Sequence, residues 1–532
     1  MTARRVAAGA AAGIAGGATL IATVTVLARV VGFGRQLVFQ WSVSETTLGA
    51  VYQTANALPN VAFEIVAGGA LASIVVPLLA VAAIRGDTEH VRQVTSALLG
   101  WTLLVLVPVA LLGVLLAGPV MEFMLRGEGG AEGVEVGRRM LLVFLPQIPL
   151  YGVAVVTAGV LHAHRRFLAA ALAPVLSSLV VASAFLVFRA QFAGNRDDLG
   201  TVDAVDEWIL AGGTTLGVLA LALTTLVPML VRVTGLTPTL RFPYGVARRA
   251  RHLAVAGVAT LVAQQIAYLT AMVMANQQAL GGGWVTYVNT WMVYLLPYAV
   301  LAVPIATAAF PRLAEHAHDD VAAYTRTLAA STRAVLLVSV TGAAVLVAVS
   351  WPVARFFRLL SQAEAVPVER MAWAVMAFAP GLIGYGLVAH LGRALYARAR
   401  GRTAAGSIVT GWLTSAVLAV VLAQLVTGER VVAALGLANT VGMTIAGVLL
   451  VFGVRRDSGP AGLQGAARLF GWAFVAGAVG AAGGWLVARA VTADSAVGIV
   501  GPGVLAAAVA VAVVLGVAWL VDRDDLRAVT RR

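Results

Sequence analysis

The chain has 532 residues, of which 60% are hydrophobic and only 11% are charged, whereas a soluble domain usually carries about 25% charged residues. This composition excludes an ordinary soluble protein, because one hydrophobic core cannot absorb the apolar excess. Every basic residue is Arg, the net charge is +13, and the lack of Cys excludes disulfides and thiol chemistry.

Apolar stretches recur along the whole chain, each about 20 residues long, which is the length a helix needs to cross a bilayer. The first stretch follows Arg4 and Arg5 and could pass for a signal peptide, but we interpret it as an uncleaved first helix. The sequence thus predicts an all-α polytopic membrane protein with about 14 transmembrane helices. The predicted spans are near 14–38, 58–84, 94–120, 140–161, 167–188, 208–231, 253–279, 285–311, 334–353, 371–392, 404–427, 431–454, 469–488 and 497–521.

The distribution of charge predicts the orientation of these spans. An even number of spans places both termini on one side, and with the amino terminus inside, most arginines fall in cytoplasmic segments and most acids outside. We therefore expect a multi-pass plasma-membrane protein with both termini cytoplasmic. The basic charge then matches anionic membrane lipids, and no nucleic acid is expected as a partner. The segment 232–252 is predicted to be cytoplasmic because it contains Arg232, Arg241, Arg248, Arg249 and Arg251.

Two short strings recur at long range. Leu58-Pro59-Asn60 opens the second span, and the similar string Leu296-Pro297-Tyr298 lies in the eighth. The string 161–166 leaves the fourth span, and the similar string 395–400 leaves the tenth. Each pair is separated by six spans, which predicts two six-helix lobes in a parallel pseudo-repeat, followed by two C-terminal helices. The predicted regions are an N-terminal lobe at 1–240, a C-terminal lobe at 241–456, and spans 13 and 14 at 457–532.

Three ionisable residues, Arg29, Arg35 and Glu64, fall at predicted membrane depth, where an unpaired charge is costly. Such groups usually face a cavity and mark a functional site. Guanidinium groups grip phosphate oxygens in a two-pronged fork, so Arg29 and Arg35 are candidate phosphate ligands. The alternative is that Arg29 or Arg35 only pairs with Glu64 and thereby stabilises helix packing.

Polar residues at helical spacing add a candidate cavity wall. Asn56 and Asn60 stand four residues apart and align with Glu64, and Gln264 and Asn289 are candidates for the opposite wall. Hydrogen bonding between helices is the competing explanation for such polar residues. The sequence shows no phosphate loop, no metal-ligand set and no nucleophile constellation. We therefore expect no cofactor and no metal, and we do not expect an enzyme.

Several strings resemble one transporter family. The segment 27–35, Leu-Ala-Arg-Val-Val-Gly-Phe-Gly-Arg, is similar to the first-helix signature of the MurJ/MviN family within the multidrug/oligosaccharidyl-lipid/polysaccharide exporter superfamily. The likeness continues across the second, fourth, eighth and tenth spans. Its strings are Leu58-Pro59-Asn60, Gly68-Gly69-Ala70-Leu71, Val76-Pro77, Leu161-His162-Ala163, Arg166-Phe167, Ala173-Pro174, Ala306-Thr307, Phe310-Pro311 and Leu395-Tyr396-Ala397-Arg398.

This resemblance implies two lobes forming a V around a cationic cavity, with the last two helices making a groove for a lipid tail. It implies a flippase that moves the undecaprenyl-diphosphate-linked peptidoglycan precursor (lipid II) from the cytoplasmic to the outer face by alternating access. Arg29 and Arg35 would contact the diphosphate. Membrane potential or a coupling cation would drive transport, and Glu64 is the candidate for ion coupling or charge compensation. Small residues at Gly480 and Gly484 are expected to leave space for the tail.

The chain also departs from the family pattern. Phe63 and Met292 stand where family members often have Arg, and Glu64 adds an acid. The sequence therefore leaves two alternatives open. One is a cation-coupled multidrug exporter, or an exporter of another lipid-linked oligosaccharide. The other is a nontransporting cell-wall assembly scaffold that recruits synthesis enzymes.

Overall fold

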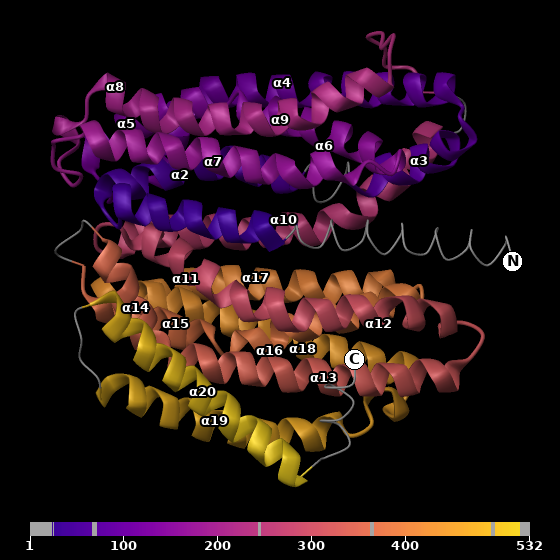
Figure 1. Cartoon of the computed structure of the whole chain (residues 1–532), viewed down its shortest axis with the longest axis vertical. Helices are drawn as coiled ribbons and strands as arrows, with labels where there is room; N and C mark the ends of the chain where they lie inside the picture. Colours follow the sequence, from indigo (N-terminus) through magenta and orange to yellow (C-terminus); the bar gives the residue numbers. More distant parts are fainter. Residues whose placement is uncertain are drawn as a thin grey trace, which may run out of the picture. The chain divides into compact units, whose positions relative to one another are not determined.

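The computed structural model describes residue 24 and residues 26–65, 72–242, 246–361, 366–490 and 495–521. All regular elements in these ranges are helical, and no strand occurs among them. The chain divides into two compact units, Met1–Leu261 (unit 1) and Val262–Arg532 (unit 2). Figure 1 shows long helices running side by side within each unit.

The first helix of unit 1 within the described ranges covers residues 26–42. The labelled helices that follow are α2 (Thr47–Phe63), α3 (Ala72–Arg85), α4 (Thr88–Met124), α5 (Gly130–Phe144), α6 (Gln147–Ala163), α7 (Phe167–Gln191), α8 (Ala204–Glu207) and α9 (Gly213–Arg232). A short π-helix, η3 (Trp208–Gly212), joins α8 to α9. The core of the unit gathers buried side chains from α3, α4, α6 and α9.

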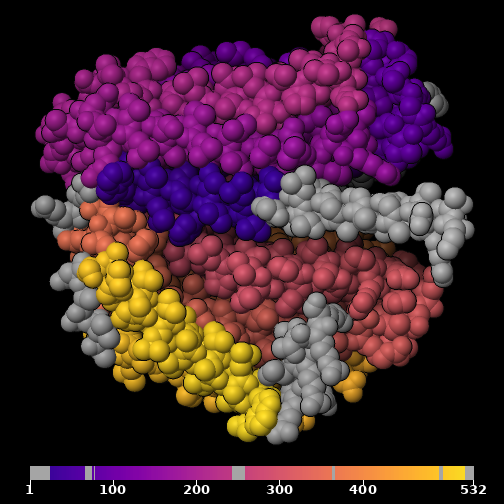
Figure 2. Space-filling view, viewed as in Figure 1, coloured from indigo at the N-terminus to yellow at the C-terminus, as the bar shows by residue number. Residues whose placement is uncertain are grey.

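The boundary between the units falls within α10 (Val246–Gln278), whereas we predicted a lobe boundary at 240. Unit 2 continues with α11 (Gly283–Pro297), η4 (Tyr298–Ala302), α12 (Val303–His316), α13 (Val321–Ala348), α14 (Ser350–Leu360), α15 (Val368–Phe378), α16 (Gly381–Ala397), α17 (Gly401–Leu425), α18 (Val431–Ser458), α19 (Ala466–Ala490) and α20 (Ala496–Val521). The last two helices pack on α13, and α20 lies obliquely across one face of unit 2 (Figure 2).

The membrane character of the chain is confirmed by helix length and composition. Eleven helical segments of the described residues are long and apolar enough to cross a bilayer, and the pair α15–α16, bent by 42°, makes a twelfth if it is one span. The two remaining predicted spans, near 14–38 and 58–84, include residues outside the described ranges. The count of fourteen therefore stays a prediction.

The start predicted for the second span is wrong. Helix α2 begins at Thr47, because the Thr46 hydroxyl accepts the Gly49 backbone N–H at 3.2 Å and caps the helix there. Pro59 lies inside α2, not at its start. Proline was a misleading boundary signal here, since a helix whose other residues are buried by packing tolerates the loss of one N–H donor.

The six-span repeat is visible in the local geometry of the fourth and tenth spans. Helices α6 and α16 both have 17 residues and directly follow a proline, Pro146 or Pro380. Each helix ends with a non-glycine residue in the left-handed region, Arg165 (φ 58°) and Ala399 (φ 56°). In each, the next backbone N–H reaches back 2.8 Å to a carbonyl five positions earlier, on Leu161 or Leu395. Both spans therefore end in the same capping motif.

The repeat extends to the sixth and twelfth spans, α9 and α18, where position 215 corresponds to position 440. The Thr215 hydroxyl of α9 donates to the Val143 carbonyl at 2.8 Å, and the Thr440 hydroxyl of α18 donates to the Ala377 carbonyl at 2.6 Å. Close glycine contacts match in the same way, since Gly217 abuts residues 177 and 181 and Gly442 abuts residues 411 and 415. Position 232 at the end of α9 thus corresponds to position 457 at the end of α18.

Candidate functional site

The two candidate arginines lie on the helix over residues 26–42. Arg29 is exposed and Arg35 is half-buried. The helix runs through Gly32 and Gly34 without a break. The six-residue separation of the two arginines turns their side chains toward different faces of the helix.

Arg35 lies close to a polar cluster formed by α2 and α6. The Asn60 amide donates to the Asn56 carbonyl at 2.7 Å, and the Tyr151 hydroxyl donates to the Asn60 side-chain oxygen at 3.0 Å. The Phe63 ring packs against Tyr151 at a tilt of 36°, with 4.4 Å between the ring centroids. Sequence reasoning missed Tyr151, because the contact joins residues on two different helices. We call Asn56, Asn60, Phe63 and Tyr151 the Asn60 cluster.

Two opposite charges approach this cluster without pairing. Both Arg35 and Glu64 are near enough to the Tyr151 hydroxyl to act on it electrostatically. Glu64 directly follows α2 and is exposed. Within the described part of the chain, no ion pair joins Glu64 to Arg29 or Arg35. The interpretation that these arginines merely neutralise Glu64 therefore has no support in this arrangement.

The predicted second wall falls in unit 2. Gln264 is half-buried on α10, and Asn289 is fully buried in α11. Met292, which stands where the family often has Arg, is half-buried on the same helix. That Gln264 and Asn289 line a substrate cavity stays a prediction.

A row of aromatic residues along α11 and into η4 was not predicted from the sequence. When Leu58-Pro59-Asn60 is aligned with its repeat in the eighth span, Gln53, Asn56 and Asn60 of α2 correspond to Trp291, Tyr294 and Tyr298. The Tyr298 ring packs on Tyr385 of α16, 4.4 Å between centroids. Residue 385 corresponds to Tyr151, so an aromatic contact in unit 2 stands where unit 1 has the Asn60–Tyr151 hydrogen bond. Aromatic residues recurring every three or four positions in 284–298 were the available signal.

Unit 2 also has an apolar groove of about 480 Å³. It lies between α13, the α15–α16 pair and α19. Phe474, Ala478, Ala482 and Trp485 form the α19 wall, and Val340 and Ile383 lie across from it. No ionisable residue is among the residues that line it.

The predicted role of Gly480 and Gly484 is wrong. A Cβ atom on Gly480 would lie 2.9 Å from the Ala510 carbonyl oxygen, and one on Gly484 would lie 2.5 Å from that of Ala506. Both glycines therefore let α20 approach α19 closely, and they do not line the groove. Spacing alone could not distinguish these two uses of a small residue.

The apolar helices and the matching halves define a multi-pass helical membrane protein with an internal repeat. Among solved structures, the fold is similar to the lipid II flippase MurJ in an inward closed conformation, with a TM-score of 0.73, 16% identity, and coverage of 96% of this chain and 100% of that chain. It is also similar to an inward-facing multidrug resistance transporter of the MATE family and MOP superfamily, with a TM-score of 0.67, 14% identity, and coverage of 82% and 96%. The chain thus shares its fold with both of these proteins.

Sequence comparison is more specific. Residues 43–506 match the family described as "Lipid II flippase MurJ", and the chain belongs to that family. A probable lipid II flippase MurJ of Rhizobium tropici is 28% identical over 232 residues. That match covers 43% of this chain and only 40% of the length of the relative.

Proposed function

We propose that this chain flips the undecaprenyl-diphosphate-linked peptidoglycan precursor, lipid II, from the cytoplasmic to the outer face of the plasma membrane by alternating access. One observation carries the proposal beyond family membership. Arg35 is half-buried in a predicted membrane span beside the Asn60 cluster, and no acid within the described ranges forms an ion pair with it. A diphosphate would supply the missing negative charge and suits the planar guanidinium fork.

The chain also has surfaces that suit the polyprenyl tail and the glycan of the proposed substrate. The apolar groove beside α19 has the chemistry of a polyprenyl tail, since its lining carries no ionisable group. Asn56 has a side-chain oxygen that is buried and has no hydrogen-bond partner among the described residues, so it can accept a hydrogen bond from a glycan. We assign to Arg29 a secondary contact with the diphosphate. We assign Gln264 and Asn289 to the wall of the substrate cavity that the second lobe contributes.

Phe63 accounts for one departure from the family. Its ring packs on Tyr151 at a place where an arginine would have added positive charge. Arg35 and Glu64 are therefore the arginine and the carboxylate that act electrostatically on Tyr151. We assign Glu64 to charge compensation or to a coupling cation, because it is exposed and free of an ion pair within the described residues.

The decisive experiment compares variants of Arg35 with and without Glu64. Arg35→Lys keeps the charge and loses the fork, so we expect normal membrane abundance and at least about a tenfold slower flipping of lipid II into the outer leaflet. Flipping is measured by exposure of the precursor on the outer face in a flippase-depleted strain. Glu89→Ala is the control for removal of an acid outside the cluster.

Removing Glu64 separates substrate binding from structural pairing. We expect the double variant Arg35→Ala with Glu64→Ala to stay defective, because the substrate, not Glu64, is the partner of Arg35. Rescue of both abundance and flipping by the double change would assign Arg35 to helix packing, since the charge of Glu64 left without Arg35 would then have caused the defect.

Export of amphipathic cations is the second candidate, favoured by the unpaired Glu64 and by the fold shared with multidrug transporters. Under this alternative Glu64→Gln would abolish drug resistance conferred by the chain and would leave lipid II exposure unchanged. Under the flippase proposal, expression of the chain restores lipid II exposure and confers no drug resistance.

A further inference from the structure

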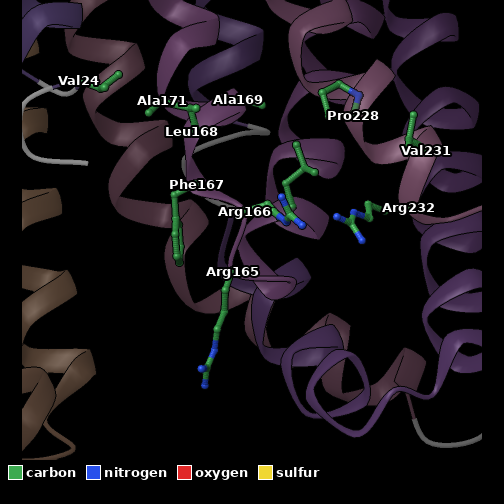
Figure 3. Close-up of a pocket in the computed structure, with 11 residues that line it drawn as sticks. Val24, Arg165, Arg166, Phe167, Leu168, Ala169, Ala171, Pro228, Val231 and Arg232 are labelled. Carbon is green, nitrogen blue, oxygen red and sulfur yellow. The ribbon is translucent and has the colours of Figure 1, made fainter. Parts of the chain in front are cut away.

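A second cluster of arginines lies far along the chain from Arg35, at the end of unit 1 that carries the loop between α6 and α7. A pocket of about 470 Å³ opens there, lined by Val24 and by the ends of α6, α7 and α9. Three arginines line it, Arg165, Arg166 and Arg232. Figure 3 shows the side chains of Arg166 and Arg232 directed toward one another, whereas Arg165 points away.

Two guanidinium groups directed toward each other repel unless an anion lies between them. Within the described residues, neither Arg166 nor Arg232 has an ion pair or a side-chain hydrogen bond. Two acids line a neighbouring pocket together with Arg232: Asp87 accepts the His90 N–H at 3.0 Å and caps α4, and Glu89 pairs with Arg92 at 2.6 Å. Among the described residues, neither of these acids forms an ion pair with Arg166 or Arg232.

The internal repeat provides a matched comparison. Residue 166 corresponds to Arg400, and residue 232 corresponds to Asp457. In unit 2 this pair is an ion pair, with 2.7 Å between the Arg400 and Asp457 side chains, and Arg398 adds a second contact to Asp457 at 3.0 Å. The same backbone framework thus holds a neutralised arginine in one unit and two arginines in the other. Arg232 stands in unit 1 where unit 2 has Asp457, so this charge reversal, not a change of fold, leaves Arg166 without the acid that pairs with Arg400.

The rest of the pocket indicates what kind of anion fits. Phe167, Leu168, Pro228 and Val231 form apolar walls beside the arginines. Val231 is 73% exposed and Leu168 is 49% exposed, at the ends of helices that cross the membrane. A free phosphate would leave these apolar side chains in water. A phospholipid would place its phosphate on the arginines and its acyl chain along this wall.

We infer that Arg166 and Arg232, assisted by Arg165, form a binding site for the headgroup phosphate of an anionic phospholipid at the membrane surface. The site is separate from the Asn60 cluster and does not depend on the proposed substrate. Because a bound lipid would neutralise the ends of α6, α7 and α9 together, it would stabilise this end of unit 1 in a membrane of suitable composition.

The test uses the full-length chain purified in a neutral detergent. Its thermal unfolding midpoint is followed while short-chain phosphatidylglycerol, phosphatidylcholine or inorganic phosphate is added, since a ligand that binds the folded state raises the midpoint. We expect phosphatidylglycerol alone to raise it. Arg232→Asp recreates the arrangement of unit 2 and so should fold while requiring at least about tenfold more lipid for the same shift. Arg166→Gln is a second variant that should also require more phosphatidylglycerol for the same shift. It tests the site even if Arg232→Asp lowers the unfolding midpoint measured without lipid.

Arg241→Asp is the matched control, because it makes the same charge change at an exposed arginine outside the pocket. It should respond to phosphatidylglycerol as the unchanged chain does. An equal response of Arg232→Asp, Arg166→Gln and the unchanged chain would overturn the site. An equal effect of phosphatidylcholine would overturn the role of charge, and an equal effect of inorganic phosphate would overturn the assignment to a lipid.

Discussion

The backbone at Ala399 stores strain that one substitution should release. A non-glycine residue in the left-handed region loses about 1 kcal/mol because its Cβ crowds the following carbonyl, and the φ of Ala399 is 56°. We expect Ala399→Gly to raise the free energy of unfolding by about 1 kcal/mol, because glycine is the usual residue at this capping position. The measurement is denaturant unfolding of the purified protein.

Ala397, two residues before Ala399, provides a control in which the free energy of unfolding should change in the opposite direction. It is the last residue of α16, in helical conformation, so Ala397→Gly should lower the free energy of unfolding by about 1 kcal/mol. The same direction of change in both variants would contradict the strain at Ala399. The pair also tests whether the capping motif shared with Arg165 is costly or neutral in this protein.

At the scale of single elements, α19 uses its two faces differently. One face carries Ala478 and Ala482 into the apolar groove, and another carries Gly480 against the backbone of α20. Ala478→Phe or Ala482→Phe should fill the groove and slow flipping about tenfold or more at unchanged abundance, if the tail binds there. The measurement is outer-face exposure of lipid II, normalised to membrane abundance.

Matched changes on α19 separate the groove from packing. Val479→Phe adds bulk at a side chain that is 58% exposed and does not line the groove, so flipping should be unchanged. Gly480→Leu should lower abundance and the thermal midpoint, because the α20 backbone leaves no room for a side chain. Normal flipping by both groove variants would count against a tail in this groove.

At the scale of the whole chain, orientation is the prediction that determines the direction of transport. The segment 232–252 is rich in arginine, and positive loops stay in the cytoplasm. A phosphatase reporter fused after Leu240 should therefore be inactive, whereas a cytoplasmic fluorescent reporter there should be bright. An active periplasmic reporter at this position would reverse the orientation, and with it the assignment of both termini to the cytoplasm.

Amino-acid order alone was enough to establish the membrane environment, the helical class, most of the spans and the repeat. These features depend on local apolar length and on recurring strings such as 161–166 and 395–400, which a linear reading can detect. The polar stripe through Asn56 and Asn60 was predicted for the same reason. The family resemblance followed from strings of this kind, and the match over residues 43–506 confirmed it.

Contacts between helices were decided only by the tertiary structure. The Tyr151–Asn60 bond joins two helices that are not consecutive in the chain, and no spacing rule predicts it. Gly480 was assigned to open space, and the fold places the α20 backbone there. From the sequence, Arg232 was interpreted only as one more cytoplasmic positive charge. The structural repeat shows that it occupies the position of Asp457, which pairs with Arg400. In each case periodicity predicts that a residue lies on a helix face, but which neighbour meets that face depends on three-dimensional packing.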